Sequence, residues 1–133
     1  MSEENPWKTK SVTTTYENPW IKVEHHDVLN PAGNPGIYGT VSFKNRAVGV
    51  VPIADNGDTW LVGQYRFPLQ EYHWEIPMGG APKGESPEDC ALRELREESG
   101  LIAESLIPIG RVHLSNCITD EEGLLFVAQG LTE

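Results

Sequence analysis

The most constraining feature of this chain of 133 residues is one strongly marked helix, set between segments that have the character of strands. Ser86 suits the N-cap of that helix, Pro87 suits its first turn, and Gly100 is a natural stop. Its apolar stripe consists of Ala91, Leu92 and Leu95. Strands before and after one strong helix predict a mixed α/β or α+β sandwich.

Turn signals divide the rest of the chain into short strands. An Asn34-Pro35-Gly36 turn and an Asn56-Gly57 hairpin turn separate apolar runs. The proline and glycines of Pro77-Met78-Gly79-Gly80 predict a loop with special backbone angles. Strands are predicted over residues 20–28, 37–44, 47–54, 59–65, 73–76, 106–114 and 123–131. No internal repeat is evident in the chain.

Length and charge restrict the classes of protein that this chain can be. Its 133 residues suffice for one domain with a core. The net charge of −10 argues against non-specific nucleic-acid binding, which needs a basic surface. No run approaches the roughly 20 apolar residues of a membrane span, and residues 1–10 carry no apolar signal core. We therefore expect a cytoplasmic protein that binds neither nucleic acid nor membranes. Cys90 and Cys117 do not make a disulfide framework.

Acidic residues concentrate on one side of the predicted helix. Residues 1–78 carry six basic and nine acidic side chains, whereas residues 79–133 carry four and eleven. Glu94, Glu97 and Glu98 are spaced i, i+3 and i+4, so their carboxylates project within a sector of roughly 100°. Three like charges at this spacing destabilise a helix unless something neutralises them.

A divalent cation is the partner that this carboxylate face suggests. Magnesium takes oxygen ligands and bridges to phosphates, and a carboxylate not fully used by the metal can position or deprotonate a water. Glu85 can join the cluster or pair with Arg93. Arg93 is also i, i+4 to Glu97 and is interpreted as an orienting residue. The alternative is a charged helix face without a metal.

Residues 79–101, GGAPKGESPEDCALRELREESGL, resemble a complete Nudix box. The pattern is Gly, five residues, Glu, seven residues, then Arg-Glu-aliphatic-any-Glu-Glu-any-Gly-aliphatic. Every specified position is filled, by Gly79, Glu85, Arg93, Glu94, Leu95, Glu97, Glu98, Gly100 and Leu101. Seven fixed residues would coincide by chance on the order of once in a billion windows. The match is therefore specific.

This resemblance implies a Nudix fold, an α/β (α+β) architecture with a mixed β-sheet sandwiched by helices and an N-terminal antiparallel strand pair. The implied metal ligands are Glu94, Glu97 and Glu98, with a backbone carbonyl of Gly80 or Ala81 completing the shell. The implied cofactor is Mg²⁺, with Mn²⁺ as a substitute. The implied reaction is attack by water on a pyrophosphate phosphorus.

The residues flanking the box resemble the subgroup of ADP-ribose and nucleoside diphosphate sugar pyrophosphatases. The runs Gln64–Arg66 and Trp74–Gly79 are similar to that subgroup's strand and its entry to the box. The resemblance implies that Arg66 contacts substrate phosphates, a role that suits a guanidinium. Glu75 would be a further metal or substrate contact. A surface arginine and an exposed structural carboxylate are the alternatives.

The subgroup also implies two functional parts. Residues 1–44 would form an N-terminal strand pair for dimerisation and base binding, and residues 45–133 a catalytic domain that is short at its C-terminus. Trp20 and Tyr38 occupy places comparable to aromatic residues that clamp the base between the subunits of a homodimer. Their alternative role is packing between strands. Glu121 best matches an acidic position that acts in catalysis, and a solvated acidic turn is its alternative.

Three hypotheses for function follow. The first is Mg²⁺-dependent hydrolysis of a small nucleoside diphosphate sugar, such as ADP-ribose, to a nucleoside monophosphate and a sugar phosphate. The second is a Nudix pyrophosphohydrolase of nucleoside triphosphates or dinucleoside polyphosphates. The third is a non-catalytic nucleotide-sugar sensor on the same fold. The intact box favours the two hydrolases over the sensor.

Overall fold

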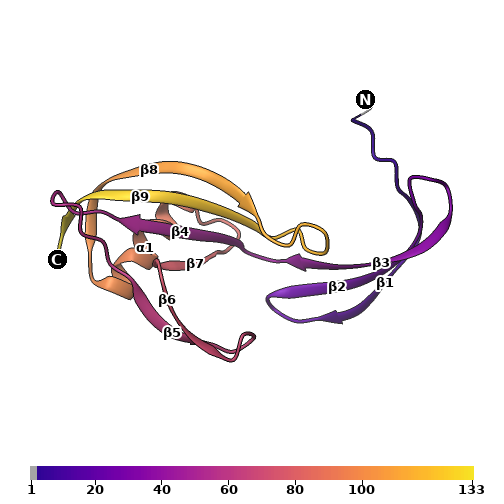
Figure 1. Cartoon of the computed structure of the whole chain (residues 1–133), viewed down its shortest axis with the longest axis horizontal. Helices are drawn as coiled ribbons and strands as arrows, with labels where there is room; N and C mark the ends of the chain where they lie inside the picture. The colour runs from indigo at the N-terminus through magenta and orange to yellow at the C-terminus, as the bar shows by residue number, and fades with distance from the viewer. Residues whose placement is uncertain (1–2) are drawn as a thin grey trace. The chain divides into compact units, whose positions relative to one another are not determined.

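A computed structural model describes residues 3–133, which divide into two compact units (Figure 1). The described part of the first unit comprises residues 3–44 and 115–121, and the second comprises residues 45–114 and 122–133. The segment 115–121, which the sequence placed with the catalytic part, therefore belongs with the N-terminal strands.

The first unit is an antiparallel sheet of three strands in the order β1-β2-β3. The strands are β1 (Lys8–Glu17), β2 (Ile21–Leu29) and β3 (Pro35–Phe43). The predicted strand pair corresponds to β2 and β3, which pair from Ile21↔Phe43 to Leu29↔Pro35. The sequence did not predict β1, because its polar residues are exposed along the whole strand and give no apolar alternation.

Asparagine side chains shape both hairpins of this sheet. The Asn18 side chain accepts hydrogen bonds from the backbone N–H groups of Trp20 and Ile21, each at 2.8 Å. Asn30 accepts in the same way from Ala32 at 3.0 Å and Asn34 at 2.9 Å. Such side chains replace the backbone partners that a tight turn leaves unsatisfied.

The second unit holds a four-stranded mixed sheet in the order β7-β4-β9-β8. Its strands are β4 (Arg46–Pro52), β7 (Met78–Ala81), β8 (Ile102–His113) and β9 (Glu122–Thr132). Strand β4 is parallel to β9 and antiparallel to β7, and β8 is antiparallel to β9. A separate hairpin is formed by β5 (Val62–Arg66) and β6 (Glu71–Glu75).

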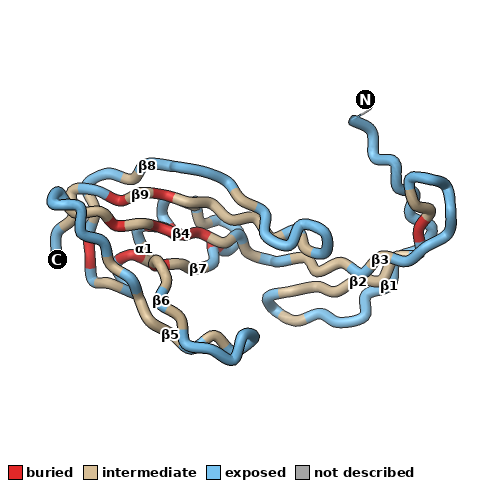
Figure 2. The backbone as a smooth tube through the Cα atoms, in the orientation of Figure 1, coloured by how far each residue is buried: buried red, intermediate tan, exposed pale blue. Residues whose placement is uncertain are grey.

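The predicted helix is confirmed as α1 (Pro87–Ser99). The Ser86 hydroxyl accepts a hydrogen bond from the backbone of Asp89 at 3.1 Å, and Gly100 ends the helix with a left-handed φ of 77°. The core lies between α1 and the sheet, where the red segments of Figure 2 gather in this unit. It consists of Val48, Val50, Ala81, Cys90, Ala91, Leu95, Leu101, Phe126 and Ala128.

Two features of this unit differ from the sequence-based expectation. Residues 78–81 form a short strand rather than a loop, because they pair with residues 46–49 of β4. Within residues 3–133, α1 is the only helix, so helical cover is present on one face of the sheet.

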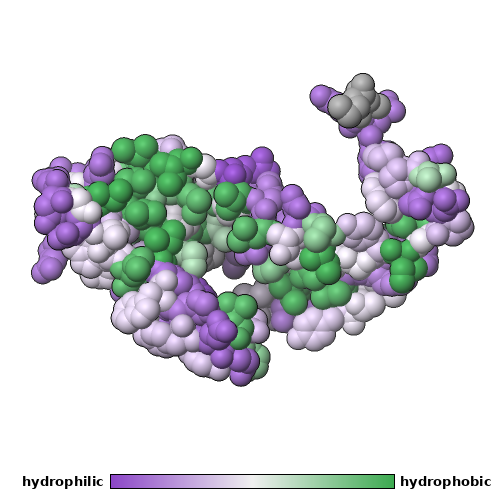
Figure 3. Space-filling view, viewed as in Figure 1, coloured by the Kyte–Doolittle hydropathy of each residue, from purple (hydrophilic) through white to green (hydrophobic). Residues whose placement is uncertain are grey.

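The other sheet face carries apolar side chains, since Val127 is in register with both Val51 and Ile107 and alternates with the buried Phe126. Figure 3 shows apolar side chains gathered over these strands. No helix of the described chain is long and apolar enough to cross a membrane.

Candidate active site

The carboxylate face of α1 packs against the β7 strand. The side chain of Glu94 is 14% exposed and passes directly over Gly79. A Cβ atom on Gly79 would lie 2.1 Å from the Glu94 carboxyl carbon, so any larger residue there would displace that carboxylate. Gly79 is therefore required for the space that Glu94 occupies, and not for an unusual backbone angle.

Arg93 is the electrostatic centre of the box. It pairs bidentately with Glu85, through Nε and Nη2 at 2.8 Å each. Its Nη1 donates to Glu94 at 2.8 Å and to Glu97 at 3.2 Å, and its Nη2 donates to the Gly80 carbonyl at 3.4 Å. The hydrogen bonds to Glu85 and then Glu94 raise the pKa of Arg93, and the hydrogen bond from Arg93 lowers the pKa of Glu85.

Glu98 is held at the other side of this face. Its Oε2 accepts a hydrogen bond from the backbone N–H of Met78 at 3.0 Å. The residue as a whole is exposed, but partial burial of its carboxyl group raises the pKa of Glu98, and the charge of Glu94 raises it further. The proton of this carboxyl group is therefore bound more tightly than usual.

The donors of the predicted metal site fit a hard divalent cation. The carboxylates of Glu94 and Glu97 and the carbonyl of Gly80 are all oxygen donors that converge on one positive group, the guanidinium of Arg93. As the side chains stand, no three His, Cys, Asp or Glu residues of the described chain form a group that could hold a metal. The side chain of Ala81 is buried in the core, at 3% exposure.

The hairpin β5–β6 brings Arg66 and Glu75 together. Arg66 Nε donates to both carboxylate oxygens of Glu75, at 2.9 and 3.1 Å, and its Nη2 also contacts Glu75. This hydrogen-bonded pair raises the pKa of Arg66 and lowers the pKa of Glu75. The charge of Glu98 further raises the pKa of Arg66. The hairpin is joined directly to the α1 face, because Met78, three residues after Glu75, donates its backbone N–H to Glu98 at 3.0 Å.

The two predicted base-binding aromatics lie apart within one chain. Trp20 directly precedes the Ile21↔Phe43 pair, whereas Tyr38 pairs with His26. About five residues of β3 separate these positions, or ~17 Å at ~3.3 Å per residue. The Tyr38 hydroxyl donates to the Cys117 carbonyl.

Tyr38 has a different aromatic partner, Trp7, which contacts it edge-to-face at 5.4 Å between ring centroids. Trp7 was not predicted from the sequence, although the tripeptide Asn5-Pro6-Trp7 is the same as Asn18-Pro19-Trp20. In both copies the asparagine side chain accepts a hydrogen bond from the backbone N–H of the tryptophan, at 3.0 and 2.8 Å. This short repeat was the signal that could have found it.

Glu121 lies in the segment that belongs to the first unit, whereas the α1 carboxylates belong to the second. It is half-buried. Its neighbour Asp120 has a defined structural role, because its carboxylate accepts a hydrogen bond from the backbone of Phe43 at 2.9 Å. A catalytic role for Glu121 stays a prediction.

The second unit combines a mixed sheet with one helix that has an acidic face, and Gly79 of β7 leaves space for the Glu94 side chain of that helix. These features are those of proteins built around a Nudix box. Residues 43–128 match the NUDIX domain family, and residues 7–41 match the nucleoside diphosphate sugar hydrolase N-terminal domain. The chain therefore belongs to the Nudix family.

Named relatives and one solved structure extend this match. An ADP-ribose pyrophosphatase of Bacillus subtilis (strain 168) is 42% identical over 86 residues, which is 65% of this chain and 46% of the relative. A methanol dehydrogenase activator of Bacillus methanolicus is 34% identical over 133 residues, 100% of this chain and 70% of the relative. A crystal structure of an ADP compounds hydrolase superposes with a TM-score of 0.88 at 25% identity, covering 99% of this chain and 71% of that one. The chain thus spans less than half the length of the first relative.

Proposed function

We propose that this chain hydrolyses the pyrophosphate bond of nucleoside diphosphate sugars such as ADP-ribose, and releases a nucleoside monophosphate and a sugar phosphate. The observation that carries the proposal is the position of Arg66, a cation held by Glu75 at 2.9 Å, three residues before Met78, whose backbone N–H donates to Glu98 on the acidic helix at 3.0 Å. A diphosphate needs both a cationic contact and a carboxylate-held metal. The names of the relatives support the same substrate class.

Glu94, Glu97 and Glu98 are the proposed ligands of Mg²⁺, for which Mn²⁺ can substitute, together with the carbonyl of Gly80 or Ala81. When bound, this ion supplies neutralisation of the diphosphate charge and a water of lowered pKa. The two hydrogen bonds between Arg93 and Glu85 do not involve the proposed metal ligands. They would therefore hold Arg93 in place when Glu94 and Glu97 bind the metal ion. The role of Arg93 is to orient these carboxylates.

Arg66 is the proposed phosphate contact, and Glu75 positions it. The contacts with Glu75 use Nε and Nη2. Arg66 Nη1 donates to no residue of the described chain, so both of its N–H groups are available to a phosphate. A guanidinium fixed in this way loses little freedom when the diphosphate binds. Glu121 is proposed as an additional catalytic carboxylate.

A homodimer is the proposed assembly, formed through residues 1–44 in the cytoplasm. Val28 is the one buried apolar side chain among the described residues of the first unit, whereas Tyr16, Trp20 and Ile37 are more than half exposed. A three-stranded sheet with so little cover gains little free energy from burial, so a second copy is the proposed cover. Since Trp20 and Tyr38 lie far apart along one chain, a base clamp would take one ring from each subunit.

The test is hydrolysis of a panel with and without Mg²⁺, with products resolved by chromatography. The panel contains ADP-ribose, other nucleoside diphosphate sugars, nucleoside triphosphates and dinucleoside polyphosphates. Mg²⁺-dependent release of a nucleoside monophosphate and a sugar phosphate is the expected result. Activity on triphosphates alone would contradict the assignment of Arg66 and retain the box.

A second candidate function is the activation of a dehydrogenase, the role that the Bacillus methanolicus relative's name states. The β5–β6 hairpin favours a protein partner, because Phe67 is 81% exposed at its tip and Trp74 is 66% exposed on its strand. The discriminating measurement is dehydrogenase activity with the chain added, compared with a Glu98→Gln variant. Activation by both forms would indicate binding without hydrolysis.

A further inference from the structure

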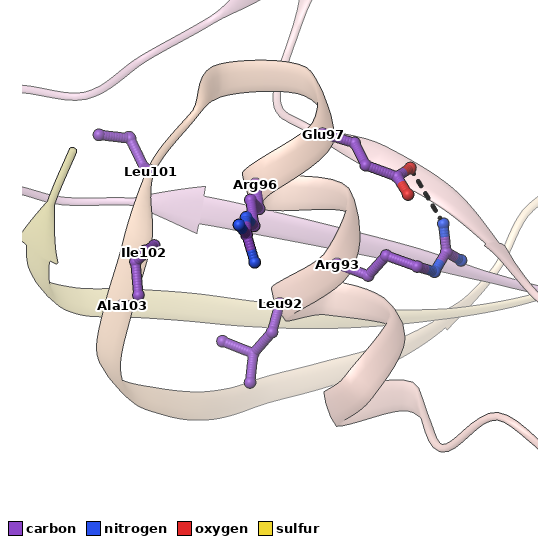
Figure 4. Close-up of a pocket in the computed structure, with 7 residues that line it drawn as sticks. All are labelled: Leu92, Arg93, Arg96, Glu97, Leu101, Ile102 and Ala103. Atoms are coloured by element: carbon purple, nitrogen blue, oxygen red, sulfur yellow. Dashed lines mark hydrogen bonds and ion pairs between the residues drawn. The ribbon is translucent and has the colours of Figure 1, made fainter.

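A cavity of about 660 Å³ lies between the outer side of α1 and the start of β8 (Figure 4). Its apolar walls are Leu92 on the helix and Ile102 on the strand, which are 39% and 51% exposed, and the buried Leu101 also lines it. Apolar side chains that face an open cavity of this size are a common basis of small-molecule sites.

Arg96 supplies the free charge of this cavity. Figure 4 shows its side chain on α1 one turn along from Leu92, and both residues line the cavity with Leu101 and Ile102. Within residues 3–133, Arg96 forms no ion pair or side-chain hydrogen bond, although the chain carries twice as many acidic as basic residues. A basic residue in the last helical turn interacts favourably with the helix dipole. This interaction explains the position of Arg96 on the helix but not the apolar cavity beside it.

Arg93 lines the same cavity but is already neutralised. Its nitrogens donate to Glu85, Glu94 and Glu97, and the bond to Glu97, at 3.2 Å, joins two residues that line the cavity (Figure 4). The cavity therefore has one guanidinium without an ion-pair partner, that of Arg96, beside apolar walls. Glu97 is the one acidic residue in its lining. This combination is complementary to a ligand with one phosphate and one apolar face.

We propose that this cavity binds a nucleoside monophosphate, with the phosphate on Arg96 and the base between Leu92 and Ile102. The choice of ligand rests on the proposed function, since a nucleoside monophosphate is the aromatic product of that reaction. A guanidinium fork matches phosphate oxygens bidentately, and the flat faces of a base suit aliphatic walls. The sugar phosphate product has the same phosphate chemistry but no base.

Calorimetric titration of the whole chain with AMP, in EDTA to remove divalent cations, tests this site. We expect Arg96→Gln to weaken AMP binding at least tenfold and Leu92→Gln at least threefold. Both positions are exposed on α1, and thermal melting by circular dichroism checks that the variants fold. Arg111→Gln is the matched control, because Arg111 pairs with Glu122 on the β8–β9 hairpin and should leave AMP binding unchanged. Ribose 5-phosphate and inorganic phosphate should bind at least tenfold more weakly than AMP.

Equal AMP affinity in the wild type and in Arg96→Gln would overturn the proposal. So would AMP binding that is lost in Arg66→Ala but kept in Arg96→Gln, because the ligand would then occupy the candidate active site. Ribose 5-phosphate binding as tightly as AMP would remove the role of the apolar walls. The titration needs no turnover, so its result is independent of whether the chain hydrolyses any member of the substrate panel.

Discussion

The two units of this chain are held together by different means. The second unit has a core of nine buried residues between α1 and its sheet, whereas the described first unit buries Val28 alone among its apolar side chains. The first unit relies on strand pairing and on turns fixed by Asn18 and Asn30. Hydrophobic burial is the dominant favourable term in folding, so we expect the second unit to be the more stable of the two. Its packed core also holds the side chains of the candidate site in place.

The largest expected effect is a loss of kcat when carboxylates of the second unit, but not of the first, are substituted. Glu97→Gln and Glu98→Gln should each lower kcat by at least about 100-fold, because each removes charge from the face that holds the cation. Glu17→Gln in the first unit is the matched control, since Glu17 forms a surface ion pair with Lys44 and the substitution should leave kcat unchanged. Near-normal turnover in both α1 variants would refute the metal assignment.

The difference in packing should appear next, in the free energy of unfolding. Leu95→Ala should destabilise the chain by about 2–5 kcal/mol, since Leu95 is fully buried in the core. Val28→Ala should cost less, because Val28 has few buried neighbours and its surroundings can relax. Urea unfolding followed by circular dichroism measures both. A larger loss for Val28→Ala would reverse the comparison.

A glycine substitution can sharpen the distinction between stability and placement within the second unit. Gly79→Ala should lower kcat/KM by about 10–100-fold, because the new methyl group displaces the Glu94 carboxylate. The side chain that must move is flexible, so the melting temperature should change little. Gly110→Ala is the control, since its Cβ meets nothing within 4 Å. Unchanged kinetics would mean that the position of Glu94 is not critical.

A smaller effect is expected at the hairpin of the second unit. Arg66→Ala should weaken transition-state binding of diphosphate sugars by about 1.5–3 kcal/mol, the loss of one charged hydrogen-bonded contact. Steady-state kinetics on ADP-ribose with Arg111→Ala as control measures this. Unchanged KM and kcat would return Arg66 to the status of a structural partner of Glu75.

The smallest effect concerns acid stability. The folded-state pKa of Glu85 is lowered by Arg93, so this pair contributes stability above the unfolded-state pKa of about 4.3, and the contribution is lost as the pH falls through the lowered value. Glu85→Gln should therefore melt below the wild type at pH 7, and the difference should shrink toward pH 3. Thermal melting across this range is the measurement. A difference that is constant with pH would assign the effect to packing.

Local signals in the sequence predicted the helix and the box, because caps, periodicity and ligand spacing all lie within residues 79–101. The antiparallel pair β2–β3 followed from turn chemistry. Strand β1 and strand β7 were missed, since a polar edge strand and a glycine-rich strand are specified by their pairing partners. The contacts of Arg66 with Glu75 and of Trp7 with Tyr38 also could not be derived from the sequence. They depend on the register of strands that pair in the folded chain.

The position of β9 has a consequence for how the chain is made. Strand β9 lies between β4 and β8, and its parallel pairing joins residues 47–52 to residues 123–128. The first unit also needs a late segment, because Val41 hydrogen-bonds with Ile118 and Asp120. During synthesis from the N-terminus, neither unit can close until the ribosome has passed residue 120. The apolar stripe of α1 is therefore made before the central strand of its sheet, and its packing surface is complete only after β9 has been synthesised.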